Sequence, residues 1–188
     1  MSAAEPLSAE DFKASMAALG APTRVIVAVS GGPDSMALAR LAAQACENAL
    51  AVTVDHGLRA GARAEAEKAG EWCRAAGLEH RILTWEGEKP AAGVQAAARA
   101  ARYRLLASLA EAEGYGAILT AHTADDQAET VFMRLARGAG AAGLSGMEAR
   151  SLIAAGAGEP ALLLRPLLGF PRARIIATLK SLEQDFVE

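Results

Sequence analysis

A glycine- and serine-rich stretch, Ser30-Gly31-Gly32-Pro33-Asp34-Ser35, follows an almost wholly apolar run and leads directly into a helical pattern. Such a loop presents several backbone N–H groups toward one point, and the positive end of the helix dipole adds to their field. Gly31 and Gly32 let the backbone approach an anion closely, and the hydroxyls of Ser30 and Ser35 can donate hydrogen bonds. The stretch therefore predicts a phosphate-binding loop.

Asp34 is the unusual member of this loop, because a carboxylate repels phosphates unless a cation lies between them. We interpret Asp34 as a Mg²⁺ ligand, either directly or through water. A plain strand–turn–helix connection with a Ser/Asp cap would also satisfy the pattern. The common P-loop is excluded, since the motif Gly-x-x-x-x-Gly-Lys-Ser/Thr is absent and the loop holds no lysine.

A second polar cluster, from His122 to Thr130, is denser in titratable groups. His122, Asp126 and Glu129 are spaced i, i+4 and i+7, which places them on one side of a helix start. Acids there could hold Mg²⁺ or the ammonium groups of an amine substrate. Thr123 with Asp126 also forms a capping-box pattern, so part of this cluster has a purely structural explanation.

Three weaker patterns accompany these clusters. The run from Asp55 to Arg59 follows an apolar run and could touch a base or ribose, although a histidine there is more often a capping or packing residue. Arg99 and Arg102, spaced i and i+3, form either a clamp for phosphate or carboxylate or a solvated basic face. Residues 138–143 match the dinucleotide pattern G-x-G-x-x-G, but they follow a predicted helix rather than a strand, so we reject a dinucleotide site there.

Apolar strands alternate with helices along the chain. We expect strands at residues 24–29, 50–54, 80–85, 117–121 and 162–164, and helices at 8–19, 36–47, 63–76, 94–113, 123–137 and 171–182. This alternation predicts an α/β fold with a doubly wound, mainly parallel five-stranded sheet and helices on both faces. The loops at 30–35, 55–57 and 122–126 should then meet at one sheet edge, near a switch point. Residues 138–158 are expected to form an extended loop.

The bulk composition sets wider limits. We expect the 188 residues to form a helical extension at 1–22 and one domain with the phosphate loop at 23–188. The net charge of −3 means that a nucleic-acid partner would need a local basic patch.

Cys46 and Cys73 have no metal-ligand spacing, so we interpret them as small apolar residues in a reducing compartment. No apolar run reaches the about 18 residues of a membrane span and no signal pattern is present, so we expect a cytoplasmic protein without membrane partners.

Taken in order, several motifs carry a resemblance to a known family. SGGPDS, VDHGLR, AARAARYRLL, TAHTADDQAET, RGAGAAGLSGM and LLRPLL resemble the tRNA(Ile)-lysidine synthetases, which belong to the PP-loop ATP pyrophosphatases of adenine nucleotide alpha hydrolase-like fold. The resemblance runs from about residue 24 to residue 185. It implies a ligase that uses ATP to adenylate the C2 oxygen of the wobble cytidine in a CAU-anticodon isoleucine tRNA. The ε-amine of L-lysine then displaces AMP and leaves lysidine.

The resemblance also implies roles for individual residues, with ATP and Mg²⁺ as the cofactors and tRNA(Ile) and L-lysine as the partners. The phosphates and the metal would be bound by Ser30, Gly31, Gly32, Asp34 and Ser35, with Asp34 as the metal ligand. The adenosine would lie near Ala28, Val54 and His56. The pocket where lysine meets the activated base would be lined by Arg102, His122, Asp126 and Glu129, the two acids holding ammonium groups and the arginine an anion. A homodimer is one possible assembly.

The chain also departs from the family pattern. Gln95 stands where the family usually has an acid, and the Asp-Ser-Asn segment and further tRNA-contacting parts of the family are absent from these 188 residues. Alternatives to the synthetase are another PP-loop enzyme, such as a tRNA thiolase or an amidating synthetase, and a non-catalytic ATP sensor. Thiolation normally uses paired cysteines, whereas Cys46 and Cys73 form no Cys-x-x-Cys. A sensor would not need His122, Asp126 and Glu129 beside its phosphate loop.

Overall fold

A single mixed sheet organises the molecule. The computed structural model describes residues 4–138, 145–155 and 158–187. The strands follow the order β3-β2-β1-β4-β6-β5, and every neighbouring pair is parallel except β5 and β6. Their bounds are β1 (Arg24–Ala28), β2 (Asn48–Asp55), β3 (Glu79–Thr84), β4 (Ala117–Leu119), β5 (Arg150–Ala155) and β6 (Gly158–Leu164). The five predicted strands correspond to β1 to β4 and β6.

Strand β5 corrects the sequence prediction. It lies within residues 138–158, which we expected to form an extended loop, so the sheet has six strands rather than five. β5 pairs antiparallel with β6 at the sheet edge, with Arg150 opposite Leu164. An edge strand has one neighbour and need not be apolar on both faces, and Leu152 is in fact 67% exposed. The apolar residues of β5 form only the short run from Leu152 to Ala155, and the glycines at positions 156 and 158 that follow are typical of a loop.

The inner strands supply two separate cores, one on each face of the sheet. In β1, Val25 and Val27 lie in the larger core while Ile26 lies in the smaller one. Since successive side chains point to opposite faces, a strand covered on both sides must be apolar at every position. This burial explains the apolar runs from which the strands were predicted.

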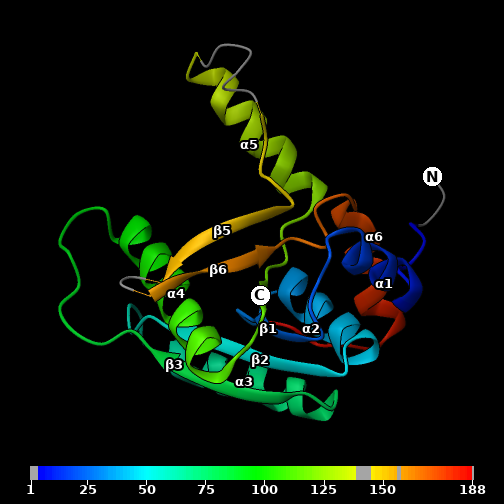
Figure 1. Cartoon of the computed structure of the whole chain (residues 1–188), viewed down its shortest axis with the longest axis horizontal. Coiled ribbons are helices and arrows are strands. Elements are labelled where there is room, and N and C mark those ends of the chain that lie inside the picture. Colours follow the sequence, from blue (N-terminus) through cyan, green and yellow to red (C-terminus); the bar gives the residue numbers. More distant parts are fainter. Residues whose placement is uncertain (1–3, 139–144, 156–157, 188) are drawn as a thin grey trace.

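Helices cover both faces, as Figure 1 shows. The helix bounds are α1 (Ala9–Ala18), α2 (Pro33–Ala45), α3 (Ala62–Ala75), α4 (Val94–Glu113), α5 (Ala124–Ala136) and α6 (Arg172–Ser181). Residues of α1, α2, α3 and α6 pack into the larger core, and residues of α4 pack into the smaller core on the opposite face. The predicted doubly wound α/β architecture is confirmed. At the start of α1, Ser8 and Asp11 form a capping box, and Phe12 is buried in the same core as α2.

Helix α5 differs from the others because none of its residues, all of which the structure describes, is buried. It extends away from the edge of the sheet (Figure 1), and Phe132 and Leu135 are 70% and 57% exposed. Gly138, the second residue beyond the end of α5, adopts the left-handed conformation. The rest of the rejected G-x-G-x-x-G pattern, at 139–143, lies outside the described residues.

The switch point of the sheet lies between β1 and β4. β1 has β2 on one side and β4 on the other, and Val27 of β1 is in register with Leu119 of β4. The loops that leave the carboxyl ends of these two strands therefore start side by side, where open α/β sheets bind their ligands. Of the helices in the described residues, none is both long and apolar enough to cross a membrane.

Candidate functional site

The loop between β1 and α2 is held in shape by its own side chains. The Ser35 hydroxyl accepts a hydrogen bond from the Ser30 N–H at 3.1 Å and donates one to the Gly32 carbonyl at 2.9 Å. Gly31 has a φ of +87°, and an added Cβ would lie 3.1 Å from Cγ2 of Val187. Gly31 is therefore required both by the backbone conformation and by a close neighbour.

Several backbone N–H groups of this loop are free to bind a ligand. Across the described parts of the chain, no acceptor is bonded to the N–H groups of Gly31, Gly32, Asp34 and Ser35. Pro33, which has no N–H, occupies the first helical position of α2. Unpaired N–H groups at a helix start combine with the helix dipole to favour an anion. The geometry fits the predicted phosphate loop.

Asp34 lies at the second position of α2 with a largely enclosed side chain. Its Oδ1 is buried, and no hydrogen bond reaches it from the residues that the structure describes. Nε of Arg172 lies 3.3 Å from this oxygen, close enough for an ion pair but without hydrogen-bond alignment. Burial raises the pKa of Asp34, the Arg172 guanidinium opposes that shift, and the charge of Asp126 adds to it.

A metal at Asp34 would need most of its ligands from elsewhere. Among residues 4–138, 145–155 and 158–187, no group of three or more His, Cys, Asp or Glu side chains is arranged to hold a metal ion. Mg²⁺ commonly takes one or two carboxylates and completes its shell with phosphate oxygens and water. The unpartnered Oδ1 of Asp34 fits that mode of binding.

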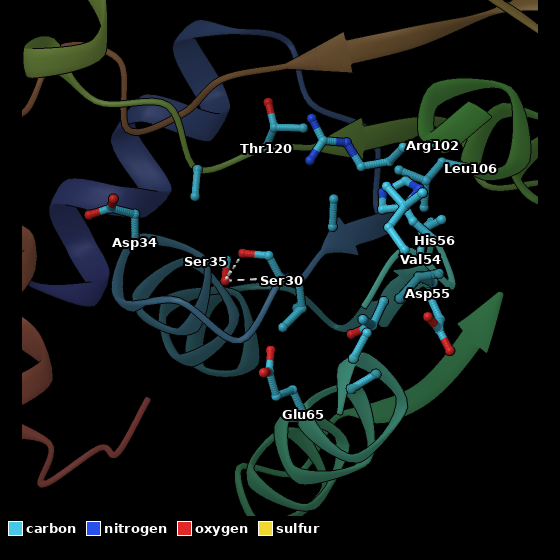
Figure 2. A pocket seen from close by; sticks show the side chains of 18 of the residues that line it. Ser30, Asp34, Ser35, Val54, Asp55, His56, Glu65, Arg102, Leu106 and Thr120 are labelled. Carbon is cyan, nitrogen blue, oxygen red and sulfur yellow. Dashed lines mark hydrogen bonds between the residues drawn. The ribbon is translucent and has the colours of Figure 1, made fainter. Parts of the chain in front are cut away.

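A cavity of about 490 Å³ opens at the carboxyl ends of the strands beside this loop. In Figure 2, Ser30 and Ser35 lie in its middle, with Asp34 on one side and Arg102 and His56 on the other. Most of the predicted site residues line the cavity: Ala28, Ser30, Asp34, Ser35, Val54, His56, Arg102, His122 and Asp126. The structure thus brings together residues from four separate segments of the chain. Gly31 and Gly32 belong to the adjoining loop backbone and are not in the lining.

One side of the cavity suits a nucleoside. Val54 and Leu106 provide apolar surface there, and His56 packs edge-on against Trp85 with ring centroids 5.9 Å apart. The Asp55 carboxylate accepts a hydrogen bond from the Gly57 N–H at 2.9 Å, which turns the chain after β2. Within the described residues, Nδ1 of His56 is buried without a partner. Burial, followed by the charge of Arg102, lowers the pKa of His56 and favours the neutral ring.

The opposite side is formed by the β4–α5 connection. Nδ1 of His122 lies 3.0 Å from the Thr120 hydroxyl. Burial, reinforced by the nearby charge of Arg165, lowers the pKa of His122 to about 4, so this ring is neutral at pH 7. Asp126 lines the cavity while its Oδ2 accepts hydrogen bonds from the N–H and hydroxyl of Thr123, at 2.7 and 2.8 Å. The Asp126 carboxylate can therefore cap α5 and line the cavity at the same time.

Besides Arg59, which is paired with Glu65, Arg102 is an arginine that lines the cavity. Its Nε is buried and has no hydrogen-bond partner within the described residues, and its guanidinium lies 5.4 Å from the ring centroid of Tyr103. Arg99 stacks on the same ring at 5.0 Å but is exposed and does not line the cavity. Gln95 lines the cavity as well. The tRNA(Ile)-lysidine synthetases, which the sequence resembles, usually have an acid at this position.

The structure does not bring Glu129 into the cavity. Glu129 is exposed, about one turn beyond Asp126 on the projecting α5, and it is absent from the lining. Its predicted role therefore stays a prediction. In the same motif Gln127 has a structural function, because its amide exchanges two hydrogen bonds with the backbone of Met147.

Two residues near the site were missed by sequence reasoning. Thr120 could have been found as the polar residue that ends the fourth strand beside His122. Arg172, which contacts Asp34, had no distinguishing signal, because it lies far along the chain from both polar clusters. Only the packing of α6 beside the start of α2 places it near the loop.

These features define a class of protein. A family model of the PP-loop domain matches residues 7–188, and the chain belongs to this family. Within it, the chain is 50% identical over 182 residues to a tRNA(Ile)-lysidine synthase of Bradyrhizobium sp., covering 94% of this chain and 49% of that one. It is 51% identical over 181 residues to the tRNA(Ile)-lysidine synthase of Rhodopseudomonas palustris, covering 93% and 51%. The chain therefore spans about half the length of these curated relatives.

Solved structures share the fold at low sequence identity. A U34-tRNA thiolase, NcsA from Methanococcus maripaludis, superimposes with a TM-score of 0.77 at 18% identity, covering 96% of this chain and 64% of that one. NMN synthetase from Francisella tularensis superimposes with a TM-score of 0.62 at 15% identity, covering 94% and 71%. At these identities the similarity shows the fold alone.

Proposed function

We propose that this chain is the nucleotide-binding catalytic part of a tRNA(Ile)-lysidine synthase, with residues 23–188 as the catalytic unit and 1–22 as a helical extension. The observation that carries the proposal is that residues of the phosphate loop line the same cavity as His122 and Asp126. One cavity that holds both an anion loop and a titratable cluster suits a reaction in which ATP activates a second substrate. The resemblance to lysidine synthases over nearly the whole chain supports that substrate choice.

In this proposal the loop binds ATP. The unpaired N–H groups after β1 receive the phosphates, while Val54 and His56 contact the adenosine. Oδ1 of Asp34 would hold Mg²⁺, whose charge offsets the negative charge that builds up on departing pyrophosphate. Fixing the cytidine C2 oxygen beside the α-phosphate supplies the proximity that the first bond needs, and pyrophosphate leaves as the tRNA adenylate forms. A wobble base is single-stranded and reachable, so no duplex must open.

The opposite side of the cavity would position lysine. Oδ1 of Asp126 remains available after capping, and we assign it, with Glu129, to the ammonium groups of L-lysine. Arg102 would bind an anionic group, and its unpartnered Nε supports this assignment. Neutral His122 can hydrogen-bond to the reacting base or to an uncharged amine. The ε-amine attacks C2 of the cytidine, and AMP departs with the former C2 oxygen.

Thiolation is less well supported. Within these 188 residues there are two cysteines. Burial raises the pKa of the Cys73 thiol to about 11 and also raises that of Cys46, so neither forms a thiolate readily. A non-catalytic ATP sensor remains the alternative outcome of the test below. A cytoplasmic location and, as one possible assembly, a homodimer belong to the same proposal.

A chimera tests the proposal, because the chain spans only half of its relatives. The 188 residues would be joined to the part of the Bradyrhizobium protein that they do not match, and incorporation of labelled lysine into CAU-anticodon isoleucine tRNA would be measured. We expect incorporation that requires ATP and is lost when Asp34→Asn is introduced. ATP binding without incorporation, while the intact Bradyrhizobium protein is active in the same assay, would contradict the proposal.

A further inference from the structure

A cation that the proposed function leaves without a role stands beside the phosphate loop. Arg172 is the first residue of α6, and its backbone N–H donates a hydrogen bond to Oδ2 of Asp125 at 2.7 Å. The N–H of Ala124 in turn donates to the Phe170 carbonyl at 3.0 Å. The starts of α5 and α6 are thereby fixed to each other, next to the start of α2.

The Arg172 side chain is held loosely. Its Nε lies 3.3 Å from Oδ1 of Asp34, and the arginine side chain is 52% exposed whereas that of Asp34 is 24% exposed. Among the described residues, no hydrogen bond reaches its two Nη atoms. A guanidinium carries five N–H donors in a fixed fork, so this group can contact a carboxylate and still donate to a phosphate.

Charge favours such a contact. The Asp34 and Asp126 carboxylates line the same cavity, and Arg172 contacts both Asp34 and Asp125, the neighbour of Asp126. Arg172 is the cation that opposes them at Asp34. Together with the Mg²⁺ proposed at Asp34, Arg172 would reduce the repulsion between these carboxylates and a phosphate that approaches the loop.

We propose that Arg172 is a further nucleotide-binding residue, which neutralises Asp34 and donates through its Nη atoms to the β- or γ-phosphate of the nucleoside triphosphate. The inference rests on the proposed function, since it takes ATP as the ligand. The proposed contact requires a β- or γ-phosphate, so a nucleoside monophosphate cannot make it. The one phosphate of a monophosphate would be held by the loop itself.

Calorimetric titrations of the 188-residue chain with ATP and with AMP test the inference. Arg172→Gln should weaken ATP binding about ten-fold or more, the loss expected for one hydrogen bond to a charged group, and change AMP binding less than about two-fold. Lys180→Gln is the matched control, because it removes one positive charge from the far, exposed end of the same helix. The control should bind both nucleotides as the unaltered chain does.

Each outcome decides the question. Unchanged ATP affinity in Arg172→Gln, or an equal loss for ATP and AMP, would overturn the inference. If thermal unfolding shows that the glutamine variant does not fold, Arg172→Met, which keeps the aliphatic stem, is judged by the same ratio of ATP to AMP affinity. Failure of the unaltered chain to bind either nucleotide would overturn the proposed function and this inference with it.

Discussion

Asp126 combines a structural and a proposed chemical role in one side chain. One of its oxygens accepts hydrogen bonds from the N–H and the hydroxyl of Thr123, the first of which belongs to the capping box, and the residue also lines the cavity. Two carboxylate oxygens allow this division, because the cap needs only one of them. Removing the charge while keeping an acceptor should therefore separate the two roles.

Asp126→Asn makes that separation, because the amide oxygen can still accept from Thr123. We expect lysine transfer in the chimera to fall by about 100-fold or more, as for loss of an electrostatic contact in an active site. ATP affinity should change less than about three-fold, and the free energy of unfolding by less than about 1 kcal/mol. Labelled-lysine incorporation, calorimetry and urea unfolding measure the three quantities.

Glu10→Gln is the control for this substitution. Glu10 is an exposed first-turn acid of α1, so the control removes the same kind of charge away from the cavity. It should leave lysine transfer unchanged. Full transfer activity in Asp126→Asn would show that Asp126 serves only as a cap.

At the scale of elements, the packing of α3 on the sheet depends on one glycine. Nδ1 of His80 in β3 would lie 2.5 Å from a Cβ added to Gly70 in α3. The ring cannot turn away freely, because its Nε2 lies 2.9 Å from the Thr53 hydroxyl in β2. This bond links the two strands beneath the helix.

Gly70→Ala should lower the free energy of unfolding by up to about 2 kcal/mol. Overpacking a core costs about 1 to 3 kcal/mol, and alanine returns about 1 kcal/mol of it through greater helix stability. Urea unfolding of Gly70→Ala, His80→Ala and the double variant gives the coupling between the positions. We expect alanine at position 70 to be neutral or stabilising once His80 is removed, and additive effects would contradict the steric explanation.

The elements that could be predicted from sequence are those with a single dominant cause. The run from Arg24 to Val29 is apolar at nearly every position because both faces of β1 are covered. Ser8 and Asp11 form a capping-box pattern that indicates the start of α1. Strand β5 was not predicted, because its short apolar run from Leu152 to Ala155 lies in a glycine-rich stretch that is typical of a loop.

At the scale of the whole molecule, topology assembles the candidate site. Parallel strands end at the same edge, so the sequence alone predicts that the loops after β1, β2 and β4 meet. The sequence does not specify how far from that edge each helix residue lies. Helical periodicity alone therefore places Glu129 with Asp126, although Glu129 lies outside the cavity, and gives no reason to place Arg172 beside Asp34.

The formation of an adenylated tRNA tests the central claim most directly. The chimera would be incubated with α-phosphate-labelled ATP and CAU-anticodon isoleucine tRNA in the absence of lysine, and the tRNA would be isolated rapidly. We expect label on the tRNA, released as AMP when lysine is added, and no label when Asp34→Asn is present. If ATP binds but its label never reaches the tRNA, the claim that this cavity activates the tRNA base would be contradicted. Label that appears on lysine after lysine is added, without ever appearing on the tRNA, would contradict it as well.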